Sequence, residues 1–511
     1  MKPILTTLIM AVVAIAVGGL AWYYTPRNEV SAVNIQIGQS LLDEESAYDS
    51  GDVYRISLEQ YDRELDSVRK IDLARESGRW VIPEKNEFLA SNADRVSRII
   101  DALRDKKILA MPSDEQKDHE EFGVVSLAET GASRAGVGST LTLEDNRRNT
   151  LAQLIVGKPT SDNPAQRFVR FPGQPQIFVI EFDEDLLTTR FPDWVDSDLL
   201  RFGNQQNQFR QMLESIDINY YFIDPKKIDD PDARTDVYRA RIYPEGDRWL
   251  YDAWVADENR KLESSPSLQR QEVNVDTLRN LISEVFAFDL RDVLEKEPAT
   301  AQELAEPSGD TPASLFDWLK ERGYRHAGFD HEQHQFDSLA GNIQIRYRNG
   351  NVDTLAIGDL AGLDMQDRNN INRYLLVTCA VDESIVPRPV DPATGSGGGE
   401  QSDRGEAESG ETAAGSETTG SDPGAPAVDD EARRERVKQQ NEREELLKLS
   451  RGRARTLNQV HADWLYVIPQ DSVGKLFPTL DSWGTGDSSP PSKSPSKSPS
   501  KSPSKSPSGK P

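Results

Sequence analysis

A weak internal repeat is the sequence feature that most constrains how this chain folds. Residues 52–205 and residues 206–387 show the same order of strand patterns, helix caps and turns. Because related repeats fold alike, the chain is predicted to contain two α+β modules, each with an antiparallel sheet and a helix. The last hairpin of the second module is interrupted, and its final strand is predicted within residues 461–485.

The first module begins with residues 53–58, whose alternating pattern is typical of a half-buried strand. The turn Ser77-Gly78 precedes another strand at residues 79–82. Asn92 stands where a helix N-cap is expected, and an apolar stripe follows it at helical spacing. The stripe comprises Val96, Ile99, Ile100 and Leu103. The remaining predicted strands are 70–74, 139–143, 151–156, 167–171 and 176–182.

The second module repeats these signals. Asn274 caps a predicted helix, and Asn349-Gly350 is typical of a hairpin turn. The pair Gly358-Asp359 corresponds to Gly157-Lys158 of the first module. In the same order, Gly328-Phe329 takes the place of the turn Phe122-Gly123. The predicted strands of this module are 215–223, 237–242, 342–347, 352–357, 373–377 and 463–468.

Three segments outside the modules have biased compositions. Residues 388–430 are rich in Gly, Ser, Thr and Glu, which predicts a disordered acidic linker. Residues 431–457 predict a charged helix with only a thin apolar stripe, which favours a solvated helix over a coiled-coil strand. Residues 486–511 repeat Ser, Pro and Lys, which predicts a disordered tail.

The N-terminus carries an uncharged apolar run at residues 4–24. At about 1.5 Å per residue, this run spans a hydrocarbon core of about 30 Å. We therefore expect residues 1–26 to be a single-pass transmembrane helix in a bacterial inner membrane, followed by a linker at residues 27–51. Lys2 places the body on the periplasmic side. The alternative is a signal peptide cut near Gly19-Leu20-Ala21.

The net charge of −26 argues against nucleic acid as a partner, since phosphate binding needs clustered Lys and Arg. The chain has one cysteine, Cys379, so neither an intramolecular disulfide nor a cysteine zinc site can form. Cys379 ends the apolar run at residues 374–379. This position predicts a buried small side chain in preference to a nucleophile.

Candidate catalytic residues are few. The closest histidine pair, His331 and His334, is spaced i, i+3 in a stretch with turn character, whereas zinc helices use i, i+4 pairs. A solvated loop is therefore expected there. Trp80 and Trp249 hold equivalent repeat positions, which favours core anchors over carbohydrate platforms. We expect no catalytic, cofactor-binding or metal-binding residues, no cofactor and no enzymatic activity.

The order of several short motifs resembles a bacterial domain-of-unknown-function family, number 4340. After the apolar N-terminal run, the motifs are Gly78-Arg79-Trp80-Val81-Ile82, Asn92-Ala93-Asp94, Phe122-Gly123-Val124 and Leu154-Ile155-Val156-Gly157-Lys158. The resemblance extends over residues 1–380 and 460–485. It implies an extracytoplasmic accessory subunit, because members are often encoded beside ABC-type permeases and gliding-motility-like auxiliary proteins. It supplies no catalytic residues.

Three functions are consistent with the sequence. The first is a membrane-tethered accessory or scaffold protein of an ABC-type, transporter-like complex. The second is a binding module for an envelope glycan or peptide, which exposed sheet edges can accept. The third is a hydrolase with an unrecognised site, which would require a cleft with convergent titratable groups or an inward-facing His331 and His334.

Overall fold

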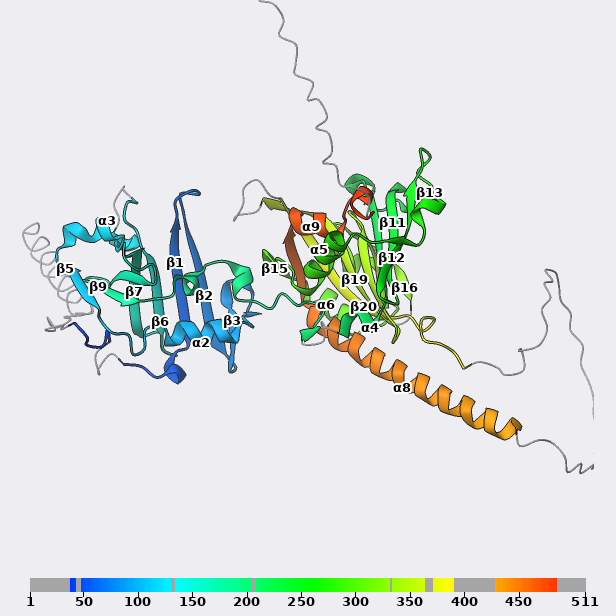
Figure 1. Ribbon diagram of the computed structural model, residues 1–511, viewed down its shortest axis with the longest axis horizontal. Coiled ribbons are helices and arrows are strands. Elements are labelled where there is room, and N and C mark those ends of the chain that lie inside the picture. Colours follow the sequence, from blue (N-terminus) through cyan, green and yellow to red (C-terminus); the bar gives the residue numbers. More distant parts are fainter. Residues whose placement is uncertain are drawn as a thin grey trace, which may run out of the picture. The chain divides into compact units, whose positions relative to one another are not determined.

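The computed structural model describes residues 37–42, 47–129, 134–203, 208–330, 333–363, 371–389 and 428–484. They form two compact units with mixed helices and antiparallel sheets, which confirms the α+β class (Figure 1). The first unit ends at Arg190, and the second contains the chain from Phe191 on together with residues Lys85–Phe88. Residues 191–203, which the repeat assigns to the end of the first module, therefore cluster with the second unit.

The first unit contains a nine-stranded sheet. Its spatial order is β4 (Phe88–Leu89), β3 (Arg79–Ile82), β2 (Ser67–Glu76), β1 (Arg55–Asp62), β6 (Ser139–Glu144), β7 (Thr150–Pro159), β8 (Gln166–Arg170), β9 (Ile177–Glu181) and β5 (Ala110–Ser113). Neighbours from β3 to β5 pair antiparallel. Helix α2 (Ala93–Asp101) begins where the sequence predicts, with the Asn92 side chain accepting from the Arg95 N–H. Helix α3 is the short segment His119–Phe122.

The second unit contains a ten-stranded antiparallel sheet. Its spatial order is β13 (Leu262–Glu263), β12 (Arg248–Ala256), β11 (Arg234–Glu245), β10 (Leu213–Ile223), β18 (Asn342–Tyr347), β19 (Asn351–Leu363), β20 (Ile371–Val381), β21 (Trp464–Pro469) and β15 (Asp292–Glu295). Strand β14 (Gln271–Glu272) also pairs with β12. The helices are α4 (Phe209–Met212), α5 (Val275–Phe286), α6 (Pro298–Ala305), α7 (Asp317–Lys320), α8 (Val428–Ala462) and α9 (Gln470–Leu476).

The two sheets have the same topology, strand for strand. In each, four early strands lie beside four late ones, and the strand after the main helix joins the far edge; β14 is an addition of the second sheet. Asn274 caps α5 as Asn92 caps α2, with its side chain accepting from Asp276 and Thr277 N–H groups. The second unit adds α6, α7 and a separate hairpin, β16 (Tyr324–Asp330) with β17 (Gln333–Ser338), before its late strands.

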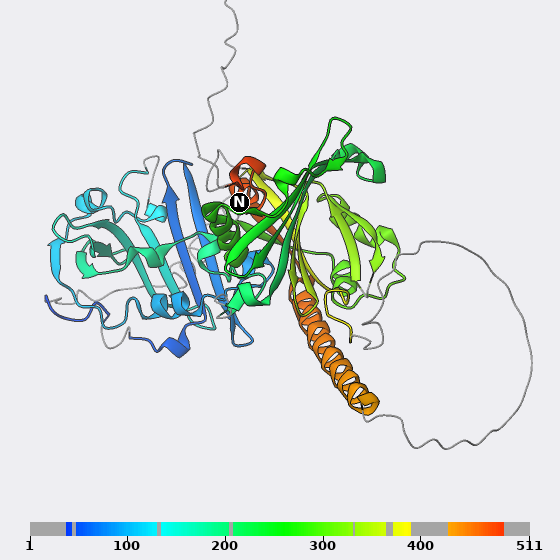
Figure 2. The same ribbon diagram turned by 45° about the vertical axis from the view of Figure 1, so that its right-hand side comes forward.

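Helix α8 fills the predicted charged-helix segment and continues to Ala462. Its C-terminal half is not the solvated helix that the sequence predicts, because one face is buried at Leu447, Ser450, Ala454, Leu457 and His461. The earlier part projects away from the second sheet, as Figures 1 and 2 show. The thin apolar stripe led to the wrong expectation, because the docked face also contains polar side chains whose hydrogen-bond partners lie elsewhere in the second unit.

The predicted membrane anchor at residues 4–24 lies outside the described residues, as do most of the acidic linker and the tail at 486–511. Within the described ranges, no helix has both the length and the apolar character needed to cross a membrane. Trp80 and Trp249 are half-buried and so are not core anchors, whereas Trp194 and Trp483 are fully buried.

A matching pair of glycines marks the equivalent bend in both sheets. The register shifts after Val156 in the β7–β8 pair and after Ile357 in the β19–β20 pair. A Cβ on Gly157 would lie 2.5 Å from the Phe122 carbonyl oxygen, and one on Gly358 would lie 2.4 Å from the Arg322 carbonyl oxygen. These contacts identify Gly323, not Gly328, as the counterpart of Gly123.

We expect Gly157→Ala and Gly358→Ala each to lower the free energy of unfolding by about 1–3 kcal/mol, because the added Cβ displaces backbone that cannot move freely. Gly474→Ala is the matched control, since no atom lies within 4 Å of its Cβ position in α9. It should raise stability by about 0.5–1 kcal/mol through reduced backbone entropy. Urea unfolding followed by circular dichroism measures all three. Equal effects of the three substitutions would contradict the close-approach argument.

Candidate functional site

A chain of three titratable side chains in the second unit is the first part of the candidate site. The His334 Nε2 lies 2.8 Å from Glu303 Oε1, and the His334 Nδ1 lies 2.9 Å from the His326 Nε2. Glu303 comes from α6, and the two histidines come from the β16–β17 hairpin. His326 also stacks on Phe316, with ring centroids 4.8 Å apart. These three hydrogen-bonded side chains therefore link α6 to the β16–β17 hairpin, both of which are additions of the second unit.

The partners determine where the protons lie in the neutral form of this chain. A carboxylate only accepts hydrogen bonds, so the His334 Nε2–H donates to Glu303. The His334 Nδ1 then accepts from the His326 Nε2–H, which leaves the His326 Nδ1 unprotonated. Half-buried His326 thus ends the chain with a basic nitrogen.

The pKa values of the two ends follow from the surroundings. Burial alone raises the pKa of Glu303, but hydrogen bonds from Thr311, His334 and Ser308 outweigh it and lower the pKa to about 2. Burial, followed by the charge of a protonated His334, lowers the pKa of His326. Glu303 is therefore a carboxylate, and His326 is harder to protonate than a free histidine.

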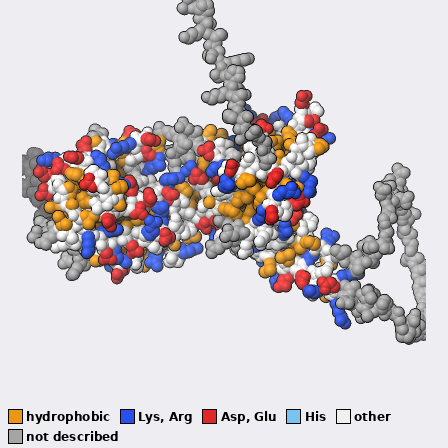
Figure 3. All heavy atoms as spheres, viewed as in Figure 1, with side chains coloured by type: hydrophobic (Ala, Val, Ile, Leu, Met, Phe, Trp, Pro, Cys, Tyr) orange, Lys and Arg blue, Asp and Glu red, His pale blue; other side chains and the backbone are white. Residues whose placement is uncertain are grey.

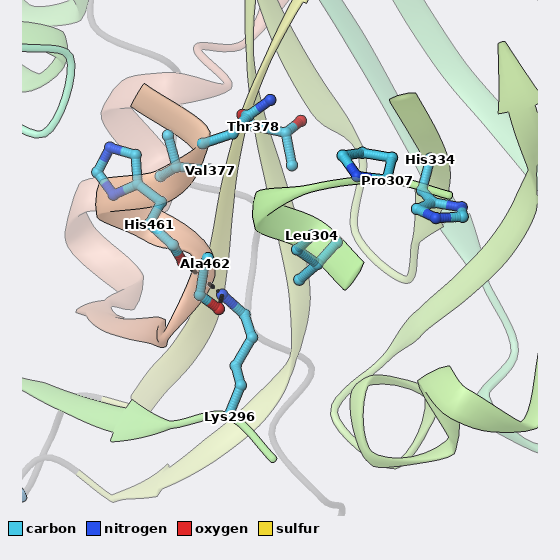
Figure 4. Close-up of a pocket in the computed structure, with 9 residues that line it drawn as sticks. Lys296, Leu304, Pro307, His334, Val377, Thr378, His461 and Ala462 are labelled. Atoms are coloured by element: carbon cyan, nitrogen blue, oxygen red, sulfur yellow. Dashed lines mark hydrogen bonds between the residues drawn. The ribbon is translucent and has the colours of Figure 1, made fainter. Parts of the chain in front are cut away.

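A small cavity lies beside this chain, lined by residues of α6, α8, β20 and β17. Its volume is about 10 Å³, enough for about one water molecule. Figure 4 shows His334 and His461 at opposite ends, with Leu304 and Pro307 between them. A substrate does not fit into this space in the state shown.

Lys296 also lines the cavity, beside the last residues of α8, and it caps the C-terminus of that helix. Its ammonium donates to the carbonyl oxygens of His461 at 2.7 Å and Ala462 at 3.1 Å, and also to that of Trp464 (Figure 4). Complete burial lowers the pKa of Lys296 to about 7, opposed by the charge of Asp463. The three carbonyls and the negative end of the helix dipole favour the ammonium form. Lys296 therefore holds the helix end in place.

His461 is buried at the end of α8 and has both ring nitrogens occupied. Its Nε2 lies 2.8 Å from the Leu199 carbonyl oxygen, and its Nδ1 lies 2.7 Å from the Tyr466 hydroxyl. Since a carbonyl only accepts, the Nε2 carries the proton and the Tyr466 hydroxyl donates to Nδ1. Burial lowers the pKa of His461 to about 3. The ring is a neutral structural link, not a free base.

An ion pair between a half-buried arginine and a buried carboxylate fastens the middle of α8 to the sheet. The Arg453 Nη1 and Nη2 each lie 2.7 Å from an oxygen of Asp353, whose side chain is fully buried. The Tyr347 hydroxyl donates to Asp353 at 2.8 Å. Arg453 also lies 3.3 Å from the Sγ of Cys379. This planar, two-pronged arrangement is the strongest geometry available to a guanidinium and a carboxylate.

Asn458 covers an open strand edge next to this pair. Strand β21 pairs with β20 only from Asn372 to Leu375, so within the described part of the chain the following residues of β20 have no strand on that side. The Asn458 side chain accepts from the Cys379 N–H at 2.8 Å and donates to the Cys379 carbonyl at 2.9 Å. It therefore pairs with the backbone as a strand would.

The residues singled out from the sequence differ in how deeply the structure buries them. Cys379 is buried as predicted, at 1% exposure, and burial raises the pKa of its thiol, so it is not poised as a nucleophile. His334 is also buried, at 4% exposure, so the expected solvated loop is wrong at that position. His331 lies outside the described residues. Within the described ranges, no group of three or more His, Cys, Asp or Glu side chains could hold a metal ion.

Residues 80–307 match the family model of a domain of unknown function (DUF4340). The chain contains this domain. The DUF4340 match runs from β3 to just past α6, so it is narrower than the resemblance predicted from the motifs, and α8 and its partner strands lie beyond it. No curated protein and no solved structure matches the chain.

Sequence reasoning missed Glu303, Lys296, Asp353 and Arg453. None stands in a recognised motif, and each has a partner that lies at least 31 residues away along the chain. One weak signal was present, the arginines within the predicted charged helix. Lys296 directly follows β15, a strand that the sequence analysis did not predict.

Arg453→Leu should lower the free energy of unfolding by about 3–5 kcal/mol, because it leaves the Asp353 carboxylate buried without its cation. Lys438→Ala removes an exposed ion pair with Glu442 on the same helix and should change stability by less than about 1 kcal/mol. The double substitution Asp353→Leu with Arg453→Leu should recover part of the loss. Urea titrations test this set, and equal losses for Arg453→Leu and Lys438→Ala would contradict it.

Stability should fall as the pH decreases below about 6.5, the pKa of an unfolded histidine. The folded pKa of His461 is about 3, so between these values the unfolded chain binds the extra proton and the folded chain does not. One such group contributes at most about 1.4 kcal/mol per pH unit. Urea midpoints between pH 7 and pH 5 should show a shallower dependence in His461→Gln than in Thr456→Ala, an exposed control in α8. Parallel curves for the two variants would rule out this role of His461.

Proposed function

We propose that the protein is a membrane-tethered, extracytoplasmic accessory or scaffold protein of an ABC-type, transporter-like complex, without catalytic activity. The observation that carries this proposal is the division of α8 into two halves. The C-terminal half is fixed by Lys296, Arg453 and Asn458, whereas residues 433–446 are exposed or half-exposed. A rigid support holding a long exposed helix is suited to contacting another protein.

The exposed half of α8 also has the surface of a contact element. Both signs of charge lie side by side along it (Figure 3), and its ion pairs include Lys438 with Glu442. Such pairs contribute little to stability, so a short helix segment without packing is marginal in water. Packing against a partner would stabilise it. The tether is supported by the apolar run at residues 4–24, and the transporter context by the family resemblance.

Crosslinking in intact cells tests this proposal. A photoreactive amino acid at Asn441, on the exposed half of α8, should crosslink to an inner-membrane protein. The same probe at Arg455, exposed on the docked half, is the matched control and should give little of that product. Recovery of the same products from both positions, or of none from Asn441, would count against α8 as the contact element.

A hydrolase is the second candidate, and the specific observation in its favour is the Glu303–His334–His326 chain. A carboxylate that orients one imidazole, which orients another, leaves the His326 Nδ1 as a general base. The adjacent cavity is too small for a substrate, so an opening motion would be required. If this candidate is correct, the protein should hydrolyse chromogenic esters and His326→Gln should abolish that turnover. The scaffold proposal predicts no turnover by the protein or by the variant.

The third function, a module that binds an envelope glycan or peptide, has a different candidate location. A groove beside Trp249 in the second unit provides the concave surface that such binding needs.

A further inference from the structure

A groove of about 430 Å³ lies between the β11–β12 turn and the first turns of α5. Its volume falls in the usual range for binding pockets. The apolar part of its lining includes Trp249, Val275, Leu278 and Ile282. Val275 is 66% exposed, which is unusual for a valine at the start of an otherwise well-packed helix. We refer to this feature as the Trp249 groove.

The indole of Trp249 is held in a fixed orientation. The Arg210 guanidinium lies over the ring, 5.4 Å from its centroid, and its Nη2 donates to the carbonyls of Gly246 at 2.6 Å and Arg248 at 3.1 Å. These bonds tie the cation to the turn that carries the tryptophan. A preorganised, half-buried indole that lines a groove is the side chain that proline-rich peptides recognise.

The chain leaves the described part of the structure next to this groove. The Trp483 carbonyl accepts from the Asn274 N–H at 2.8 Å, and the Ser482 carbonyl accepts from the Thr277 hydroxyl at 2.7 Å. Asn274 directly precedes Val275, so the end of the described chain is fixed at the rim. Pro490 follows Gly484 by a few residues, within a reach of about 20 Å.

Charge also matches the tail to the groove. The lining contains the exposed carboxylates of Asp247 and Glu272, and no described residue forms an ion pair with either. Arg248 and Arg279 also line the groove, but each already has a carboxylate partner, Glu245 at 4.0 Å and Asp276 at 2.6 Å. The tail beyond Gly484 contains Lys493, Lys497, Lys501, Lys505 and Lys510 against one carboxylate, Asp487. A basic tail on a chain of net charge −26 is attracted to its own acidic body.

We propose that the tail of this chain binds its own Trp249 groove, with Pro490-Pro491 against the indole and Lys493 near the rim carboxylates. An extended polyproline conformation advances about 3.1 Å per residue, which carries Lys493 beyond the apolar part of the groove. The tail is then a built-in ligand, and it blocks the groove to any peptide of similar composition. This inference is independent of the proposed scaffold function.

A spin label on the tail of the full chain in mild detergent tests the proposal. Cys379 is 1% exposed, so a Ser489→Cys variant takes the nitroxide label at the tail alone. The label should be largely immobilised, and an excess of a synthetic peptide of residues 487–497 should release it. A label at Ser508→Cys, far along the tail, should be mobile throughout. Equal mobility at the two positions would overturn the proposal.

Substitutions in the groove locate the binding site. Trp249→Ala should release the Ser489→Cys label, as should the pair Asp247→Lys and Glu272→Lys, which leaves the apolar lining intact. Trp249→Phe should retain part of the immobilised signal, and Trp80→Ala, the equivalent position of the first repeat, should retain all of it. Circular dichroism confirms that each variant is folded. Immobilisation that survives Trp249→Ala, or that increases with protein concentration because a second copy supplies the groove, would overturn the proposal.

Discussion

The ion pair between Asp353 and Arg453 is the interaction on which the organisation of the second unit depends. Asp353 is fully buried on β19, and separating it from its guanidinium would leave a bare charge in the interior. Arg453 belongs to a segment inserted within a hairpin, so the ion pair holds this inserted segment against the sheet. Once α8 is docked, its C-terminus meets Lys296 and His461 reaches Leu199. The buried polar contacts of Lys296 and His461 therefore depend on the docking of α8, which this ion pair stabilises.

The length of β20 explains why the insertion is needed at this place. In the first unit, β9 pairs with β8 along almost its whole length, from Gln166 to Val169. In the second unit, β20 continues to Val381, while β21 pairs with it only as far as Leu375. An uncovered edge invites pairing with other chains. The side-chain amide of Asn458 pairs with this edge, so the inserted helix protects the part of β20 that extends beyond β21.

Local patterns predicted most of the sheet framework, because caps, alternation and turn glycines act over a few residues. Asn92 and Asn274 cap their helices as expected, and Gly157 and Gly358 occupy equivalent bends. The site was not predictable in this way. Glu303 and His334 meet only because α6 packs beside the added hairpin, which also shifted the counterpart of Gly123 away from Gly328. The docked face of α8 was missed because Ser450, Arg453 and Asn458 are polar, and a hydrophobic stripe does not reveal satisfied polar burial.

The two ends of α8 have opposite physical requirements, and this contrast bears on function. The docked half is held by a buried lysine, a buried histidine and the ion pair to the buried Asp353, so moving it exposes or unpairs several groups at once. The exposed half has charged side chains on nearly every face and depends on the docked half for its direction. Closing the open edge of β20 needs the turns from Leu447 onward, and one turn earlier Arg443 donates to the Glu383 carbonyl at 3.1 Å. In the proposed function, the additional turns are the part of α8 that contacts another protein, and the docked half is the rigid base for that contact.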